Sequence, residues 1–234
     1  VDGVNVLNTG LDNMGAIFHP ALTLLNAGRI ESTSGDFQFY IDGVTPSVAR
    51  VLEVLDRERV TVASSLGIRA QTAVEWLAMA YNAYGTDLNE TIHNQPGYFG
   101  IKAPPTLGHR YITEDVPMSL VPIAALGERY GVSTRGMNSI IQLGCIIHRT
   151  DYWRRGRTLD KLGIDKLSVS ELTEWVNYGQ GVHGFVSPQV VDAARRIFVP
   201  LAPAEAAPLA VPTEAEILVH AAVAVMAAGE SSGG

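Results

Sequence analysis

The spacing of apolar residues along the chain predicts mainly helices. The clearest one begins with Thr45 as N-cap and Pro46 at the first helical position, where a proline loses no needed N–H group. The apolar positions that follow lie on one stripe at helical spacing: Val48, Val51, Leu52, Leu55 and Val62. Gly67, directly after Leu66, predicts the end of this helix.

Similar periodicity predicts further helices joined by short, glycine-marked connections. They cover residues 71–84, 119–130, 134–147 and 168–178. Two short runs are strand-like instead, residues 4–7 and residues 37–41, the second ending at the turn pair Asp42-Gly43. Because strand signals are otherwise scarce, the chain is predicted to be an all-α helical array that keeps one remnant strand near its N-terminus.

The character of the chain changes past Gly184. A short helix is predicted near residues 188–198, and the proline- and alanine-rich stretch up to Pro212 is typical of a semi-rigid linker. Thr213 and Glu216 then resemble a capping box at the start of an alanine-rich helix. The predicted division is therefore a strand and connection over residues 1–12, a helical domain over residues 13–184 and a C-terminal extension over residues 185–234.

Composition narrows the class of protein. The 234 residues are 47% hydrophobic and 18% charged with a net charge of -7, which indicates a mildly acidic globular protein. An acidic surface does not attract phosphate backbones or anionic headgroups, so neither a nucleic acid nor a membrane is expected as a partner. The longest apolar stretch, residues 217–228, is also shorter than the roughly 20 residues that span a bilayer.

The single cysteine and the first residues bear on the compartment. Cys145 stands alone in an apolar run, so a disulfide framework and a thiolate metal site are both excluded. A basic segment followed by an apolar one is absent after Val1, and no signal peptide is predicted. Together these features favour a reducing compartment, the cytoplasm.

Several kinds of site can be set aside on spacing alone. The histidines show no HExxH or other ligand-pair spacing, so no metal is expected. They are His19, His93, His109, His148, His183 and His220. The sequence also has no GxGxxG, P-loop or GxSxG motif, which means that it carries no dinucleotide or phosphate cradle of its own.

Two segments hold candidate chemistry. His19 stands in the apolar stretch 14–22, directly before Pro20, where its near-neutral titration suits a general acid or base. Residues 109–117 contain charged, aromatic and hydroxyl groups between two proline breaks. The planar guanidinium of Arg110 suits a phosphate or carboxylate, and Asp115 can orient an imidazole. A buried structural histidine and a solvated loop with a helix cap are the alternatives that the pattern leaves open.

The ordered motifs of the chain resemble those of a known family. They are His19-Pro20, residues 25–31, Phe39-Tyr40, residues 42–50, residues 55–59, the string 109–117, Asp151-Tyr152, residues 156–159 and Leu162-Gly163. Their order and spacing over roughly residues 4–179 resemble the α-helical domain of the octopine/nopaline (opine) dehydrogenases. The resemblance implies a helical array of the 6-phosphogluconate-dehydrogenase C-terminal-like type.

The resemblance also implies an activity. Enzymes of this family condense an amino acid with a 2-oxo acid into an imine, which NAD(P)H reduces. His19 then matches the histidine that exchanges a proton with the substrate, and Asp115 matches its carboxylate partner. Arg110 matches the arginine that reaches the cofactor, and Asn13 would lie near the substrate on the connection between two domains.

The cofactor and partners follow from the same resemblance. NAD or NADP would be bound mainly by an upstream Rossmann domain, whose last strand would be residues 4–7. The segment from residue 180 onward matches no part of the family, so the resemblance implies nothing about it. Helical domains of such dehydrogenases often dimerise, so a homodimer is expected by analogy. Two other readings stay open: a cofactor-independent helical enzyme, and a non-enzymatic oligomerisation or binding module derived from this domain.

Overall fold

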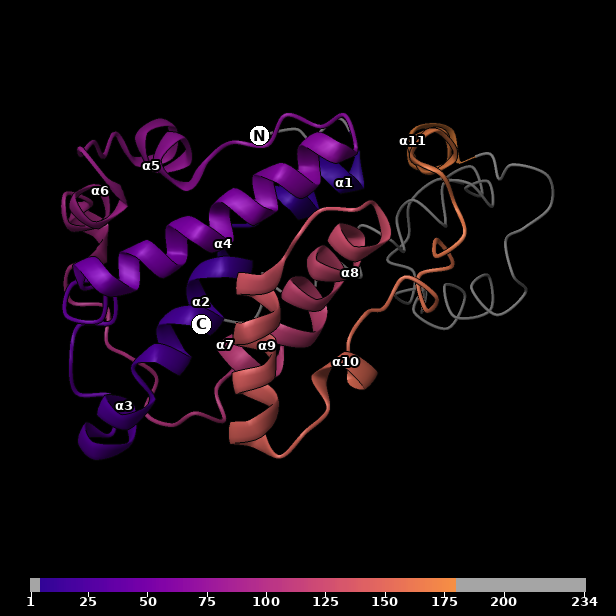
Figure 1. The fold of residues 1–234 in the computed structure, drawn as a ribbon. Helices are drawn as coiled ribbons and strands as arrows, with labels where there is room; N and C mark the ends of the chain where they lie inside the picture. Colours follow the sequence, from indigo (N-terminus) through magenta and orange to yellow (C-terminus); the bar gives the residue numbers. More distant parts are fainter. Residues whose placement is uncertain (1–4, 180–234) are drawn as a thin grey trace, which may run out of the picture. The chain divides into compact units, whose positions relative to one another are not determined.

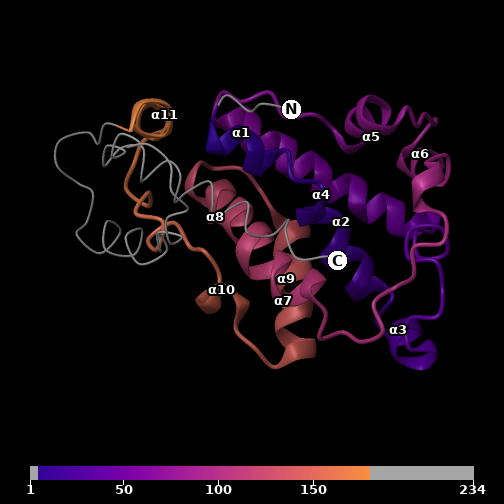
Figure 2. The same ribbon diagram turned by 180° about the vertical axis from the view of Figure 1, so that it is seen from behind.

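A computed structural model of the protein describes residues 5–179. Helices dominate this part of the chain, as Figures 1 and 2 show. The α-helices are α1 (Val6–Leu11), α2 (Gly15–Leu25), α3 (Ala27–Thr33), α4 (Pro46–Ser65), α5 (Ala73–Tyr81), α6 (Leu88–His93), α7 (Arg110–Thr113), α8 (Val121–Arg129), α9 (Arg135–His148), α10 (Tyr152–Arg155) and α11 (Val169–Tyr178). A 3-10 helix, η1 (Pro96–Tyr98), and a π-helix, η2 (Val116–Leu120), complete the described elements.

The chain forms two compact units, residues 11–158 and residues 1–10 with 159–234. In the described part of the second unit, the side-chain amide of Asn5 donates a hydrogen bond to Oδ1, the side-chain oxygen of Asn177 in α11. A capping box of Ser168 and Glu171 begins α11, because each side chain accepts a backbone N–H of the other residue.

Helix α2 lies at the centre of the larger unit, between α4 and α9 (Figures 1 and 2). Its residues Ala16, Ile17, Ala21 and Leu22 are fully buried. Helix α2 also packs against α7 and η2, which brings the start of the chain to residues about a hundred positions later. The core of the unit therefore fixes the place of any side chain that α2 carries.

The predicted helices are found close to their predicted positions. Helix α4 begins after Thr45, whose hydroxyl accepts from the Val48 N–H, and Gly67 follows its end with a positive φ of 72°. The helix predicted over 71–84 is shorter, since Asn82 adopts the left-handed conformation after α5. The prediction of an all-α array is confirmed.

Both predicted strands are wrong in the described residues. From Val6 on, the first run is helix α1, because the Asn5 side chain accepts from the backbone N–H groups of Leu7 and Asn8 and so caps a helix. The buried Leu7 and Leu11 are also four residues apart, which is helical spacing.

The run 37–41 forms only an isolated bridge, between Gln38 and Lys102. Directly after it the backbone turns, since the N–H groups of Asp42 and Gly43 both donate to the Gln38 carbonyl. The turn closes before a second strand can pair. The elements predicted from residue 185 onward lie outside the described residues.

A buried ion pair ties three segments of the larger unit together. Arg59 of α4 is fully buried and donates to Asp56 at 2.6 Å and to the backbone carbonyls of Leu11 and Gln71. The second oxygen of the Asp56 carboxylate accepts from the Ala73 N–H at 2.8 Å. One guanidinium therefore fixes the segment that leads into α2 and the start of α5 onto α4.

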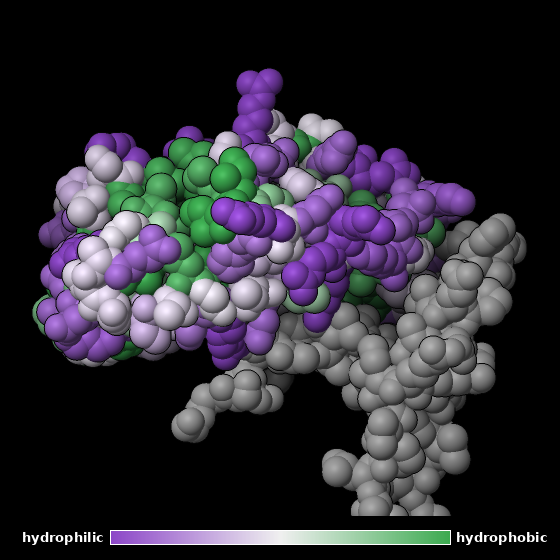
Figure 3. Space-filling view, turned by 90° about the horizontal axis from the view of Figure 1, so that it is seen from below, coloured by the Kyte–Doolittle hydropathy of each residue, from purple (hydrophilic) through white to green (hydrophobic). Residues whose placement is uncertain are grey.

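Helix α9 buries Met137, Ile140 and Ile141, yet Leu143 and Ile146 on the same helix are exposed. The last turn of α9 points toward the face drawn in Figure 3, on which an apolar area is visible.

Among the described residues, no helix combines the length and the apolar character needed to cross a membrane.

Candidate active site

The structure brings His19 and Asp115 together. His19 projects from the middle of α2, and Asp115 lies between α7 and η2, both of which pack against α2 (Figure 1). The distance from His19 Nδ1 to Asp115 Oδ2 is 2.8 Å across 96 positions of sequence. The imidazole is 26% exposed and the carboxylate side chain 11%, so both are largely shielded from water and the imidazole is the more accessible of the two.

The partner of each ring nitrogen follows from this geometry. An ionised carboxylate only accepts hydrogen bonds, so His19 Nδ1 carries the proton and donates it to Asp115. In the neutral ring, Nε2 then carries the lone pair. None of the described residues makes a hydrogen bond to Nε2. The ring is thus held in the tautomer whose far nitrogen can take up a proton.

Asn13 lies close to the same imidazole. A Cβ atom built on Gly15, the first residue of α2, would lie 3.1 Å from Asn13 Oδ1 and 3.1 Å from His19 Cε1. Both side chains therefore approach the same glycine, which leaves room for them because it has no Cβ of its own.

Arg110 is the first residue of α7, five residues before Asp115. Its Nε lies 3.3 Å from Glu114 Oε2, and its side chain is 32% exposed. It directly follows His109 in the sequence, and its positive charge lowers the pKa of the His109 imidazole. The four residues singled out in the sequence are thus spread over α2, the segment before it, and the two ends of α7.

Two neighbours of the pair were not predicted from sequence. The Tyr111 ring stacks on the imidazole of His19, and burial raises the pKa of the Tyr111 hydroxyl above its ordinary value. The rings of His109 and Tyr111 meet in a T-shaped arrangement, with centroids 4.3 Å apart. Both residues belong to the string 109–117, but ring contacts across 90 positions leave no periodic signal in a sequence.

His109 also caps α7, because its Nδ1 accepts from the Tyr111 N–H. Burial lowers the pKa of His109 below its ordinary value of 6.5, and the nearby Arg110 and His19 lower it further. A folded-state pKa below the unfolded value means that the unfolded chain binds more protons. The stability that this neutral cap contributes is therefore complete above pH 6.5 and is lost as the pH falls through the folded-state pKa.

The substitution His109→Asn tests this cap. Asparagine is a good N-cap that does not titrate, so the variant is expected to lose this component of the pH dependence of stability. The measurement is the urea midpoint of unfolding at pH values above and below 6.5, for both proteins. An unchanged slope of stability against pH in the variant would show that His109 is not the titrating cap.

Residues 5–179 contain no group of three or more His, Cys, Asp or Glu side chains that could hold a metal ion.

Comparison with known proteins adds a family to this geometry. The model for NAD/NADP octopine/nopaline dehydrogenase, alpha-helical domain, matches residues 3–148. An opine dehydrogenase of Arthrobacter sp. (strain 1C) is 38% identical over 166 residues, which are 71% of this chain and 46% of that protein. A vitopine synthase of Allorhizobium ampelinum (strain ATCC BAA-846 / DSM 112012 / S4) is 28% identical over 166 residues, 70% of this chain and 46% of that protein.

A solved structure shares the fold. The structure of octopine dehydrogenase in complex with NADH and agmatine covers 69% of this chain, with a TM-score of 0.53 and 20% identity, and the match covers 50% of that chain. The chain therefore spans about half the length of the curated relatives that it matches.

Proposed function

Because the chain belongs to the NAD/NADP octopine/nopaline dehydrogenase family, whose alpha-helical domain it matches over residues 3–148, we propose that it is the substrate-side half of an opine dehydrogenase. The proposed reaction is the NAD(P)H-dependent reductive condensation of an amino acid with a 2-oxo acid. The printed names of the relatives, an opine dehydrogenase and a vitopine synthase, support this class of reaction.

The observation that carries the proposal is the 2.8 Å contact between His19 Nδ1 and Asp115 Oδ2. A histidine whose Nδ1 is bonded to a carboxylate is held in one tautomer, which leaves Nε2 to act as a general acid or base. The partial exposure of the imidazole supports access by a substrate. Asn13, beside the same ring, would contact the substrate.

Proton transfer by His19 fits each stage of the reaction. The amine adds to the carbonyl carbon of the 2-oxo acid, and loss of water gives an imine. Reduction then adds a hydride to the imine carbon, and the nitrogen ends with a proton. His19 Nε2 would give and take the protons of these steps, while Asp115 stabilises the positively charged imidazolium without being protonated itself.

The dinucleotide, when bound, supplies the hydride. Its phosphates need a glycine-rich turn at the start of a helix, and the 234 residues contain no such motif. We therefore propose that a Rossmann domain binds most of the cofactor. Arg110 would be this chain's contribution, because it is a partly exposed cation five residues before Asp115 and suits an anionic phosphate.

The proposed organisation follows from this division of labour. Residues 13–184 would form the substrate domain, and residues 1–12 would connect it to the cofactor domain. No function is assigned to residues 185–234. The single cysteine supports a reducing location, the cytoplasm, and pairing of two helical domains into a homodimer rests on analogy alone.

A hybrid enzyme tests the proposal. In the Arthrobacter opine dehydrogenase, this chain replaces the 166 residues that it matches, and consumption of NADH is followed with pyruvate and a panel of amino acids. We expect NADH to be consumed only when both an amino acid and the 2-oxo acid are present. A folded hybrid that still binds NADH but never consumes it under these conditions would overturn the proposal.

A further inference from the structure

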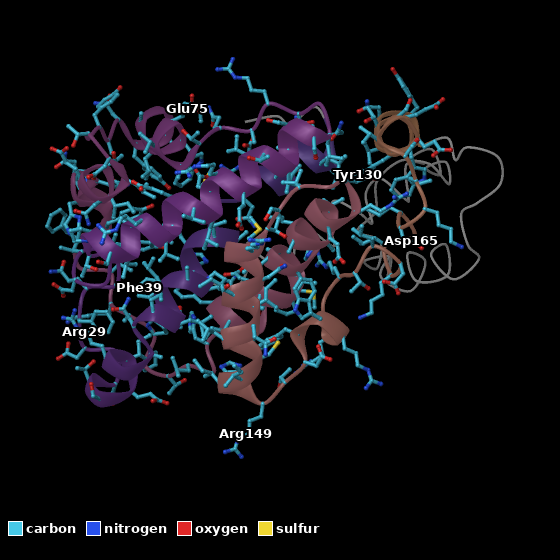
Figure 4. All side chains as sticks on the ribbon, in the orientation of Figure 1. Arg29, Phe39, Glu75, Tyr130, Arg149 and Asp165 are labelled. Carbon is cyan, nitrogen blue, oxygen red and sulfur yellow. The ribbon has the colours of Figure 1, made fainter. Side chains whose placement is uncertain are left out.

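Three aromatic rings form a row that ends at His19. The ring of Tyr111 is stacked on the imidazole, with centroids 4.0 Å apart and an angle of 16° between the planes. Phe39 also stacks with Tyr111, at 5.4 Å and 21°. Phe39 is fully buried and lies on the connection between α3 and α4 (Figure 4). The row therefore connects a partly exposed imidazole to the hydrophobic core.

The middle ring of this row is itself held in place. The rings of His109 and Tyr111 make a T-shaped contact with an angle of 77° between their planes, and the Tyr111 N–H donates to His109 Nδ1. Phe39 is anchored by its backbone, whose N–H donates to the Ile101 carbonyl at 2.7 Å. A shift of Tyr111 would therefore disturb its ring contact with Phe39 and the cap of α7.

A single hydrogen bond does not fix the orientation of an imidazole. The bond from His19 Nδ1 to Asp115 restrains one atom of the ring, and the χ2 torsion of histidine has a broad energy minimum. A flat ring at 4.0 Å removes this freedom, because rotation of the imidazole would break the stack or drive the two rings into each other.

We propose that Tyr111 is a positioning residue that fixes the plane of the His19 imidazole and so the direction of Nε2. Asp115 sets the tautomer, and Tyr111 sets the plane. The effect comes from the face of the ring and not from the hydroxyl group. The consequence for catalysis rests on the proton-transfer role proposed for His19, whereas the consequence for the ring itself does not.

The ring is tested first, in the chain of 234 residues by NMR. The Nδ1–H proton of His19, assigned by its loss in His19→Gln, is expected to exchange with water about 5-fold faster or more in Tyr111→Leu, which corresponds to the ~1 kcal/mol of an aromatic pair. Tyr111→Phe keeps the ring face and is expected to exchange as the wild type does. If the leucine variant does not fold, Tyr111→Met removes the ring at similar volume and takes its place.

A matched control comes from the same aromatic region. Tyr98 stacks on Tyr40 at 4.1 Å and 12° but makes no ring contact with His19. Tyr98→Leu is therefore expected to leave the exchange of the His19 proton unchanged. Equal exchange in Tyr111→Leu and wild type, or equal acceleration in Tyr98→Leu, would overturn the proposal.

Kinetics of the hybrid enzyme give the second readout. Misplacing a catalytic group by a fraction of an ångström lowers the rate of the chemical step and leaves the affinity for substrate unchanged. Tyr111→Leu is therefore expected to lower kcat by about tenfold with little change in KM. A raised KM at unchanged kcat would overturn the proposal, since Tyr111 would then bind substrate. An inactive wild-type hybrid would count against the proposed function, and the exchange experiment would still decide the role of Tyr111.

Discussion

Replacing His19 by alanine is expected to lower kcat of the hybrid enzyme by about 10²–10⁴-fold, the usual contribution of a general acid or base. The imidazole is hydrogen-bonded to Asp115 at 2.8 Å, and among the described residues its Nε2 has no hydrogen-bond partner. Without it, water must carry the protons of imine formation and reduction. The measurement is the rate of NADH consumption at saturating amino acid and 2-oxo acid.

A second substitution at His19 separates proton transfer from hydrogen bonding. The amide of His19→Gln can still donate to Asp115, but it cannot take up a proton, and its kcat is expected to be as low as that of the alanine variant. Thermal unfolding checks that both variants are folded. An alanine variant that keeps most of the wild-type rate would remove His19 from the mechanism.

Replacing Arg59 by methionine is expected to lower the free energy of unfolding by about 3–5 kcal/mol. The substitution leaves the Asp56 carboxylate buried without its counter-charge, and the carbonyls of Leu11 and Gln71 lose their donor. The segment that leads into α2 would lose its attachment to α4. This segment includes Asn13, which lies beside the His19 ring. Urea denaturation of the chain measures the effect.

Two further variants interpret that result. Arg57 lies on the same helix but is exposed, so Arg57→Met is expected to change stability by less than about 0.5 kcal/mol. Adding Asp56→Asn to Arg59→Met removes the stranded charge while one oxygen still accepts from Ala73, and part of the loss is expected to return. Equal stability of Arg59→Met and Arg57→Met would show that the buried pair is not needed.

Local signals made much of the fold predictable. Helix α4 could be predicted because its cap, its first-turn proline and its apolar stripe all lie within some twenty positions of each other. Helix α2 escaped prediction since Pro20 interrupts its middle, and a proline there removes an N–H donor. Tertiary packing overrides that cost, because α2 is buried between α4 and α9.

The site could be predicted only in part. The family resemblance, and not any periodic pattern, paired His19 with Asp115, and their contact spans 96 positions. Arg59 could not be singled out, because a charged residue in an amphipathic helix usually marks the solvated face. The stack of Tyr111 on His19 depends on where a short bridge places Phe39, which no local signal encodes.

The most direct test of the His19–Asp115 pair is a double-mutant cycle on kcat of the hybrid enzyme. Asp115→Asn alone is expected to reduce kcat by up to about 10⁴-fold, because the imidazole is no longer held in the productive tautomer. If Asp115 acts only through His19, the double variant His19→Ala/Asp115→Asn is expected to be no slower than His19→Ala alone. Two losses that multiply in the double variant would contradict this, since each residue would then act without the other.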